Sequence, residues 1–259
     1  SGQPKFENWD PTLPPGELVQ IGANVGGSIA MVAAATALIA MPQISFAQDA
    51  AEEPSGPFEI DAEVGAFTDY RFRGLSLSGK DPQVTAEVTV THESGLYATA
   101  WASNVDLGSG ADDVELDLSL GFSKDVGNVS LDAGVLAYLY PGNGSFNYLE
   151  LYGSIGVPVG PATVTLGAAY APSQNNIGST DNTYVYISGE LPFKDSPISL
   201  HGTFGYEDGA FGDKKRDWLL GASYDLGKGF TATLDYVDTA RAFSTAGKAT
   251  AVFSITKSF

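Results

Sequence analysis

The chain has 259 residues, a length that suits one large β domain, and its 13 Lys and Arg against 31 Asp and Glu give a formal net charge of −18. This acidic balance argues against nucleic-acid binding, because nucleic-acid interfaces need basic patches. The chain contains 0 Cys, which excludes structural disulfides, thiolate metal sites and a lipid-modified cysteine.

The N-terminal segment has features of an export signal. Residues 29–40 form an apolar run that is too short to span a bilayer as a helix. Ser45 and Ala47 occupy the positions that a signal peptidase reads before the cleaved bond, so cleavage after Ala47 is expected. We interpret residues 1–47 as an atypical export segment, with a short buried helix as the alternative. Residues 48–57 are interpreted as a flexible acidic linker.

The sequence from Phe58 to Phe72 alternates between two kinds of side chain. Every second residue in it is apolar or aromatic, apart from Thr68, and the residues between them include several acids and Arg71. Side chains alternate faces along a strand, so this pattern predicts a strand with one apolar face and one charged face. In a soluble sandwich the apolar face would be packed in the protein core and the charged face would contact water. In a membrane barrel the apolar face would contact lipid and the charged face would line the lumen.

The same alternation recurs to the end of the chain. A mean hydropathy of −0.01 agrees with it, because a barrel with one polar face has apolar residues only at every other position. Each segment has about ten residues, which at ~3.3 Å per residue and a tilt near ~45° matches the ~25 Å apolar band of an outer-membrane barrel. The predicted strands are centred on residues 58–72, 83–92, 96–104, 114–123, 129–140, 147–157, 162–171, 183–191, 198–206, 217–226, 230–238 and 249–259.

The connections alternate between long and short. An even number of strands puts both termini of the barrel on one side. The short turns share that side and the long loops lie opposite, which is the layout of transmembrane barrels. A soluble sandwich has no reason to sort its loops in this way, and a lipocalin-like barrel has too few strands. Residues 58–259 are therefore predicted to be all-β, an antiparallel up-and-down transmembrane barrel of about 12 strands in a Gram-negative outer membrane. The long connections are 74–82, 105–113, 141–146, 172–182, 207–216 and 238–248, and the short ones are 92–95, 124–128, 158–161, 192–197 and 225–229.

The two faces can be assigned from the acids. In the fourth segment Leu118 lies on one face, and Glu115 and Asp117 lie on the other. Turning such acids toward lipid would cost up to a few kcal/mol per charge at the bilayer midplane, so we expect the apolar rows to face lipid. The third segment is ambiguous, because Leu96 and Trp101 fall on opposite faces.

The chain ends in ATAVFSITKSF. This ending resembles the C-terminal signal of bacterial outer-membrane barrels, which the assembly machinery reads as an exposed strand edge. The resemblance implies the barrel assembly machinery as a partner, through Phe259, besides outer-membrane lipid. The alternating apolar row consists of Ala251, Phe253, Ile255 and Phe259.

A longer resemblance covers about residues 64–160. The stretch TDYRFRGLSLSGKDPQVTAEV, followed by SGLYATAWASNVD, DVELDLSLGF and NYLELYGSIGVPV, resembles the TorF-type porin family of proteobacterial outer-membrane proteins. That family shows an aromatic residue, an Arg-Gly pair, a Ser-containing loop and a Pro that opens the next strand. The resemblance implies an outer-membrane location and a pore, and it implies no substrate. The matching residues are Tyr70, Phe72, Arg73, Gly74, Ser76, Ser78 and Pro82, and then the segment from Gly95 to Asn104.

The inward rows are expected to carry carboxylates into the lumen. An acidic wall raises the local concentration of cations, so we expect passive diffusion of small hydrophilic solutes or ions, with a preference for cations. Arg71 and Arg73 are expected to face acids across a constriction; alternatively, the acids only keep the lumen wet and the arginines pin neighbouring strands. The lumen and constriction candidates are Glu59, Asp61, Glu63, Arg71, Arg73, Glu87, Glu115, Asp117, Glu150 and Glu190, and Asp132 and Asp235 share the inward row.

Barrel size limits the width of the lumen. Eight strands leave an interior that side chains can fill and sixteen leave an aqueous channel, so twelve lie between these cases. The inward tyrosines are expected to narrow the lumen or close it: Tyr138, Tyr152, Tyr184 and Tyr186.

Two other classes of function stay open. One is a closed structural or adhesive barrel, and the other is an outer-membrane lipid hydrolase with a Ser–His pair. His92 lies beside Ser94, and His201 shares a face with Ser199, but neither pair occurs in a recognisable nucleophile motif. We therefore predict no enzyme, no catalytic residue, no metal site and no cofactor.

Overall fold

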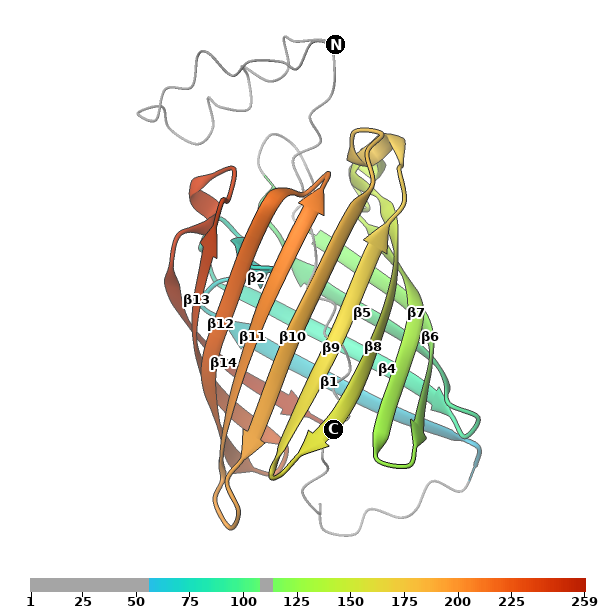
Figure 1. Cartoon of the computed structure of the whole chain (residues 1–259), viewed down its shortest axis with the longest axis vertical. Coiled ribbons are helices and arrows are strands. Elements are labelled where there is room, and N and C mark those ends of the chain that lie inside the picture. The colour runs from blue at the N-terminus through green and yellow to red at the C-terminus, as the bar shows by residue number, and fades with distance from the viewer. Residues whose placement is uncertain (1–55, 108–113) are drawn as a thin grey trace.

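The computed structural model describes residues 56–107 and 114–259 (Figure 1). The predicted export segment 1–47, and most of the predicted linker 48–57, lie outside these residues. Within the described ranges, no helix is both long enough and apolar enough to cross a membrane.

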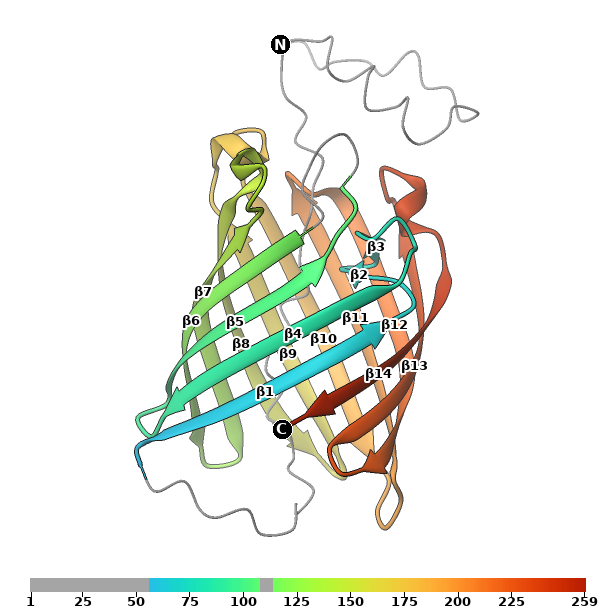
Figure 2. The ribbon, with the colours of Figure 1, turned by 180° about the vertical axis from the view of Figure 1, so that it is seen from behind.

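Twelve antiparallel strands close into a barrel in which each strand pairs with its neighbours along the chain, and β1 closes the circle against β14 (Figures 1 and 2). This confirms the predicted fold. The barrel strands are β1 (Phe58–Phe67), β4 (Gln83–His92), β5 (Leu96–Asn104), β6 (Val114–Val126), β7 (Val129–Leu139), β8 (Tyr148–Val159), β9 (Ala162–Ala171), β10 (Asn182–Pro192), β11 (Ile198–Gly209), β12 (Gly212–Gly227), β13 (Phe230–Ala240) and β14 (Thr250–Ser258). Two short strands, β2 (Arg71–Phe72) and β3 (Leu75–Ser76), form a separate sheet, and three 3₁₀ turns are η1 (Gly144–Phe146), η2 (Asn175–Ile177) and η3 (Thr245–Gly247).

The two ends of the barrel differ as the loop lengths predict. The C-terminus and the short turns lie at one end, and the connections that carry the 3₁₀ turns lie at the other (Figure 1). One predicted long loop, 207–216, is wrong. There β11 runs to Gly209 and β12 begins at Gly212, because Glu207 and Lys215 stand directly opposite each other as a strand pair. Glu207 and Lys215, which resemble loop residues in the sequence, are therefore inward-facing strand residues.

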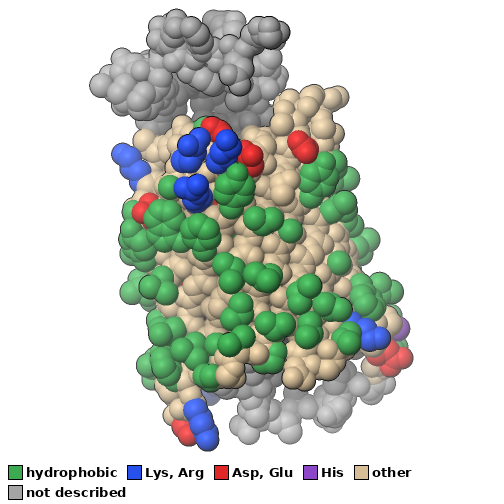
Figure 3. All heavy atoms as spheres, in the orientation of Figure 1, with side chains coloured by type: hydrophobic (Ala, Val, Ile, Leu, Met, Phe, Trp, Pro, Cys, Tyr) green, Lys and Arg blue, Asp and Glu red, His purple; other side chains and the backbone are tan. Residues whose placement is uncertain are grey.

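The outer wall is apolar. Leu120 and Leu220 are 63% and 67% exposed, whereas the inward Glu115 is 0% exposed. Figure 3 shows hydrophobic side chains over the middle of the wall, with charged side chains gathered near the two ends. The apolar rows therefore face lipid, as predicted. Trp101, whose facing was ambiguous, is buried and points inward.

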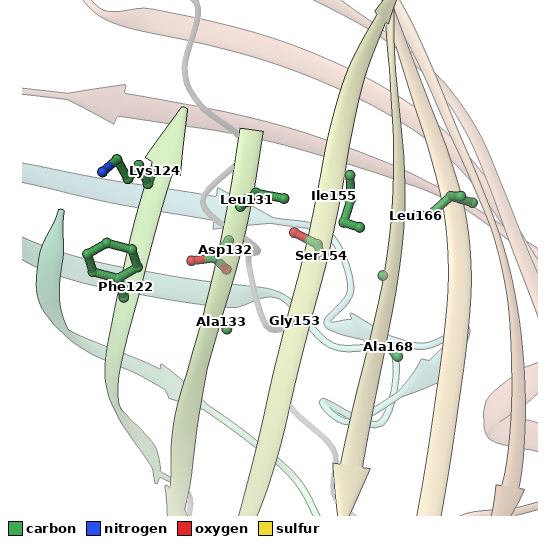
Figure 4. Close-up of a pocket in the computed structure, with 11 residues that line it drawn as sticks. Phe122, Lys124, Leu131, Asp132, Ala133, Gly153, Ser154, Ile155, Leu166 and Ala168 are labelled. Atoms are coloured by element: carbon green, nitrogen blue, oxygen red, sulfur yellow. The ribbon is translucent and has the colours of Figure 1, made fainter. Parts of the chain in front are cut away.

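A shallow depression on the outer wall spans β6 to β9 (Figure 4). Small residues at Ala133, Gly153 and Ala168 lower the surface there, between larger apolar side chains such as Phe122 and Ile155. Since these side chains belong to the lipid-facing rows, the depression contacts membrane and is separate from the lumen.

Inward tyrosines lie flat against the wall over glycines of the neighbouring strand. Tyr97 stands directly opposite Gly121, and Tyr186 directly opposite Gly167. A Cβ atom added at either glycine would collide with the tyrosine ring. This pairing covers the glycine backbone with an aromatic ring, and it narrows the lumen less than a ring pointing to the barrel axis would.

Candidate constriction in the barrel lumen

The connection between β1 and β4 folds into the barrel mouth. We call residues 68–82 the plug hairpin; it contains β2 and β3 (Figure 2). Its side chains Tyr70, Phe72 and Leu77 are buried together with inward side chains of the wall. The predicted first strand, 58–72, is therefore too long. Tyr70 and Phe72 continue its apolar alternation, but they pack inside the lumen and make no contact with lipid.

Asp69 organises the hairpin. Its carboxylate accepts hydrogen bonds from Ser76 Oγ at 2.6 Å, from Ser78 Oγ at 3.2 Å and from Arg71 Nε at 2.6 Å. The Tyr70 N–H donates to Ser78 Oγ at 3.0 Å. These bonds hold both arms of the loop to one carboxylate.

The tip of the hairpin is a tight turn. Arg73 and Gly74 both have positive φ, 43° and 83°, a region that favours glycine. The Gly74 carbonyl accepts a hydrogen bond from Thr239 Oγ1 on β13 at 2.9 Å. A Cβ atom at position 74 would collide with the Thr239 side chain and would lie 2.7 Å from Asp217 Cβ. The tip therefore fits the wall only with glycine at position 74.

Arg73 pins the hairpin to two strands of the wall. Its Nη2 lies 2.7 Å from Glu150 Oε2 on β8, and its Nη1 lies 2.8 Å from Glu207 Oε1 on β11. The guanidinium carbon is also 4.4 Å from the centroid of the Tyr184 ring on β10. The Arg73 side chain is 5% exposed and both carboxylates are 1% exposed, so these are buried ion pairs.

Lys215 adds a second cation beside Glu207. Its Nζ lies 2.8 Å from Glu207 Oε2 and donates to the Arg73 carbonyl at 2.5 Å. Glu207 thus joins a cation of the wall to a cation of the plug hairpin. Burial opposes the charge of Arg73, but the nearby carboxylates of Glu150 and Glu207 raise the pKa of Arg73 well above its ordinary value.

Aromatic side chains fill the lumen at the same level. Tyr138 and Tyr148 stack with their centroids 4.2 Å apart, and Phe211 packs against Tyr148 at 5.1 Å. Tyr70 of the plug hairpin meets Trp101 at 5.7 Å. Side chains therefore occupy the mouth of the barrel at this level.

Three buried acids of the wall each have one carboxylate oxygen without a hydrogen-bond partner among the described residues. Glu150 accepts from Tyr138 OH at 2.8 Å, and Glu115 accepts from Tyr140 OH at 2.8 Å. Among the described residues, Glu115 Oε2, Asp117 Oδ1 and Glu150 Oε1 have no hydrogen-bond partner. Buried polar atoms are nearly always satisfied, so unpaired acceptors here indicate that the site can take further donors.

The predicted site residues occupy three levels of the barrel. Arg73 and Glu150 meet at the constriction, where Glu115 and Asp117 are also buried. Arg71 pairs with Asp69 at 2.6 Å and donates to the Ala246 and Lys248 carbonyls, so it joins the hairpin to an outer loop.

The remaining candidates are not brought to the constriction. Their side chains line the lower wall: Glu63 and Glu87, directly opposite each other and half-buried; Glu59 and Asp61, exposed toward the short-turn end; and Glu190, opposite His201. His201 Nε2 lies 2.7 Å from Asp235 Oδ1. In the described residues, no cluster of three His, Asp or Glu side chains is arranged to hold a metal ion.

Sequence reasoning missed Glu207 and Lys215, because 207–216 was interpreted as a loop, and it did not select Asp217 at the start of the predicted strand 217–226. The available signal was the alternation itself, since Lys215 and Asp217 continue the inward row of β12. The inward fold of Tyr70 and Phe72 had no such signal, because aromatic residues suit lipid and lumen equally.

Gly74→Val tests whether the tip depends on its fit to Thr239. Undocking should expose Arg71 and Arg73, and we expect trypsin to cleave there about tenfold faster than in the unmodified protein. The matched control is Gly178→Val, which has a positive φ of 79° but nothing within 4 Å of an added Cβ. Equal cleavage of Gly74→Val and the unmodified protein would contradict the docked tip.

Comparison with known proteins adds a family. The sequence profile of a family described as "Bacterial protein of unknown function (Gcw_chp)" matches residues 51–259. The chain belongs to the Gcw_chp family. No curated protein sequence matches it.

Solved structures similar to the Gcw_chp chain are outer-membrane channels. The KdgM porin has a TM-score of 0.54 at 10% identity, covering 77% of this chain and 98% of that one. The NanC porin has a TM-score of 0.51 at 9% identity, covering 78% and 99%. The COG4313 outer membrane channel from Pseudomonas putida F1 has a TM-score of 0.50 at 12% identity, covering 81% and 100%. At such identities the likeness shows the fold, which is the porin-type barrel.

The location follows from the wall and the family. Bacterial barrels with an apolar outer band are proteins of the outer membrane, where closure leaves no unpaired strand edge in lipid. The Gcw_chp barrel is therefore an outer-membrane protein.

Proposed function

We propose that the Gcw_chp barrel is a narrow channel for passive diffusion of small hydrophilic solutes or ions, with a preference for cations, and that the plug hairpin controls its mouth. The observation that carries this proposal is the docking of the hairpin through Arg73 to the luminal acids Glu150 and Glu207. We expect this closure to be reversible, because the charges of a loop that leaves the lumen are stable in water.

Excess acid at the constriction supports the preference for cations. Carboxylates with low-dielectric surroundings focus a negative potential, which concentrates cations and repels anions. The buried ionisable side chains of the constriction and the plug hairpin are six acids, Asp69, Glu115, Asp117, Glu150, Glu207 and Asp217, and three bases, Arg71, Arg73 and Lys215.

The excess of acidic side chains also affects which class of solute the channel would admit. One solved structure of similar fold is "KdgM porin in complex with disordered oligogalacturonate". Oligogalacturonate is a polyanion, and an acid-rich constriction disfavours such solutes electrostatically. We therefore propose neutral and cationic solutes for this channel.

A closed structural barrel is the second candidate, and the filled mouth favours it. Tyr138 and Tyr140 are 0% exposed, so the docked hairpin leaves little room at this level. The channel and the closed structural barrel differ in whether the plug hairpin ever leaves the lumen.

Three further proposals concern the rest of the chain. Membership of the TorF-type group is supported by the Arg73–Gly74 tip, which is built into the constriction. Residues 1–47 would direct export in a Gram-negative cell. Recognition by the barrel assembly machinery would use Phe259, which is 67% exposed and whose N–H donates to the Ala62 carbonyl at 2.9 Å at the barrel seam.

The reversal potential of purified protein in a planar bilayer under a KCl gradient tests the proposed function. We expect small current steps with a reversal potential of the sign for K⁺ preference, and a shift toward zero in Glu115→Gln/Asp117→Asn. Asp213→Asn removes an exposed acid at the outer end of β12, and it should leave the potential unchanged. Inserted protein that stays silent would favour the structural barrel, and anion preference would overturn the proposal.

A further inference from the structure

The wall residues that hold Arg73 form a site of their own. We call Glu150, Tyr184 and Glu207 the cation cradle. They come from β8, β10 and β11, so the barrel sheet positions them whether or not the plug hairpin is docked. Asn182 Nδ2 supports Glu207 Oε1 at 3.0 Å, and Tyr138 OH supports Glu150 Oε2 at 2.8 Å. The cradle is therefore preorganised by contacts within the wall.

The cradle has the chemistry to recognise a planar nitrogen cation. Two carboxylates receive two different nitrogens of one guanidinium, at 2.7 Å and 2.8 Å, and the ring of Tyr184 covers its face at 4.4 Å. Carboxylates that take separate N–H donors suit guanidinium and amine groups, and an aromatic face adds cation–π attraction. Hydrated inorganic cations gain less from this arrangement, because they present no N–H donors.

Acceptors beyond those used by Arg73 remain at the cradle. Glu150 Oε1 is buried without a partner in the described residues, and Asp117 Oδ1 and Glu115 Oε2 are unpaired among the acids of the same constriction. A side-chain guanidinium has five N–H donors, and its own chain restricts where they point. A free solute with guanidinium or amine groups can turn its donors toward these acceptors.

We propose that the cation cradle is a binding site for guanidinium- or amine-bearing solutes, and that Arg73 occupies it as an internal ligand. This inference rests on the proposed function, because a solute reaches the cradle only through a conducting mouth. Solute and Arg73 compete for one site, so binding of the solute keeps the plug hairpin out.

The test uses the full chain in detergent with Arg73→Ala and two probes of nearly equal shape, ethylguanidinium and the neutral ethylurea. We expect millimolar ethylguanidinium to raise the unfolding temperature of Arg73→Ala and to leave the unmodified protein unchanged, because Arg73 already fills its cradle. Ethylurea should have no effect on either. In Arg73→Ala/Glu150→Gln, binding should be weaker by about tenfold, because one charged acceptor is gone.

Equal effects of the two probes on the unfolding temperature would contradict the proposal that the cation cradle binds guanidinium-bearing solutes. Undiminished binding in Arg73→Ala/Glu150→Gln would also contradict it. Arg73→Gln, which keeps most of the side-chain volume, serves the same test if Arg73→Ala does not fold.

A bilayer recording of the same variant separates the two proposals. If Arg73→Ala conducts but ethylguanidinium does not bind, the cradle fails and the channel stands. If ethylguanidinium binds but the inserted protein is silent, the channel fails and the cradle is a site in a closed barrel.

Discussion

Replacing residues 69–80 with a short Gly-Ser linker is expected to raise single-channel conductance several-fold. The deletion removes Tyr70, Phe72 and Arg73 from the mouth, so the side chains that close it against the wall are lost. Twelve strands then leave a lumen wider than that of the filled eight-stranded barrels. Conductance in planar bilayers at fixed salt measures the change.

The control for this deletion is Arg241→Ala. Arg241 pairs with Asp213 at 2.8 Å, and both side chains are more than half exposed, so the variant removes an outer-loop cation without altering the plug hairpin. Its conductance should equal that of the unmodified protein. A deletion variant that folds and conducts no better than Arg241→Ala would show that the hairpin does not close the mouth.

Glu207→Ala is expected to lower the free energy of unfolding by about 3–5 kcal/mol, the usual effect of removing one partner from a buried ion pair. Glu207 is the carboxylate between Arg73 and Lys215, and Lys215 lies on β12 with its side chain 1% exposed. Arg73 can leave with the hairpin, but Lys215 is fixed in the wall beside Asp217 at 3.7 Å. Urea unfolding in detergent micelles measures the loss.

Two variants make the Glu207 result specific. Glu207→Gln keeps the volume and one acceptor, so its loss should be smaller than that of Glu207→Ala. Asp213→Ala breaks the exposed pair with Arg241 and should change the free energy of unfolding by about 0–1 kcal/mol. Equal losses in Glu207→Ala and Asp213→Ala would contradict a buried charge network at the constriction.

Much of the barrel could be predicted because the period of a strand is fixed by its backbone. Predicted strands 83–92, 96–104 and 162–171 coincide with β4, β5 and β9. Facing was predictable where acids mark the inward row, as at Glu115. The facing of Trp101 was ambiguous, because an indole side chain suits both lipid and the lumen. Its burial depends on packing against Tyr70.

The constriction could be predicted only in part. Arg73 was expected to face acids, and the structure brings it to Glu150. Its second partner, Glu207, lies 134 residues away along the chain. The direction of the 68–82 connection depends on packing between Tyr70, Phe72 and side chains of distant strands, and alternation within one segment carries no information about such contacts.

The rate at which a thiol in the plug hairpin reacts with a membrane-impermeant maleimide tests the central claim most directly. With 0 Cys in the chain, Leu77→Cys introduces a single thiol where the native side chain is 4% exposed, and Phe243→Cys places one in an outer loop where it is 66% exposed. If the hairpin occupies the lumen, position 77 should react about a hundredfold more slowly than position 243. Equal rates at the two positions would show that the hairpin lies outside the barrel.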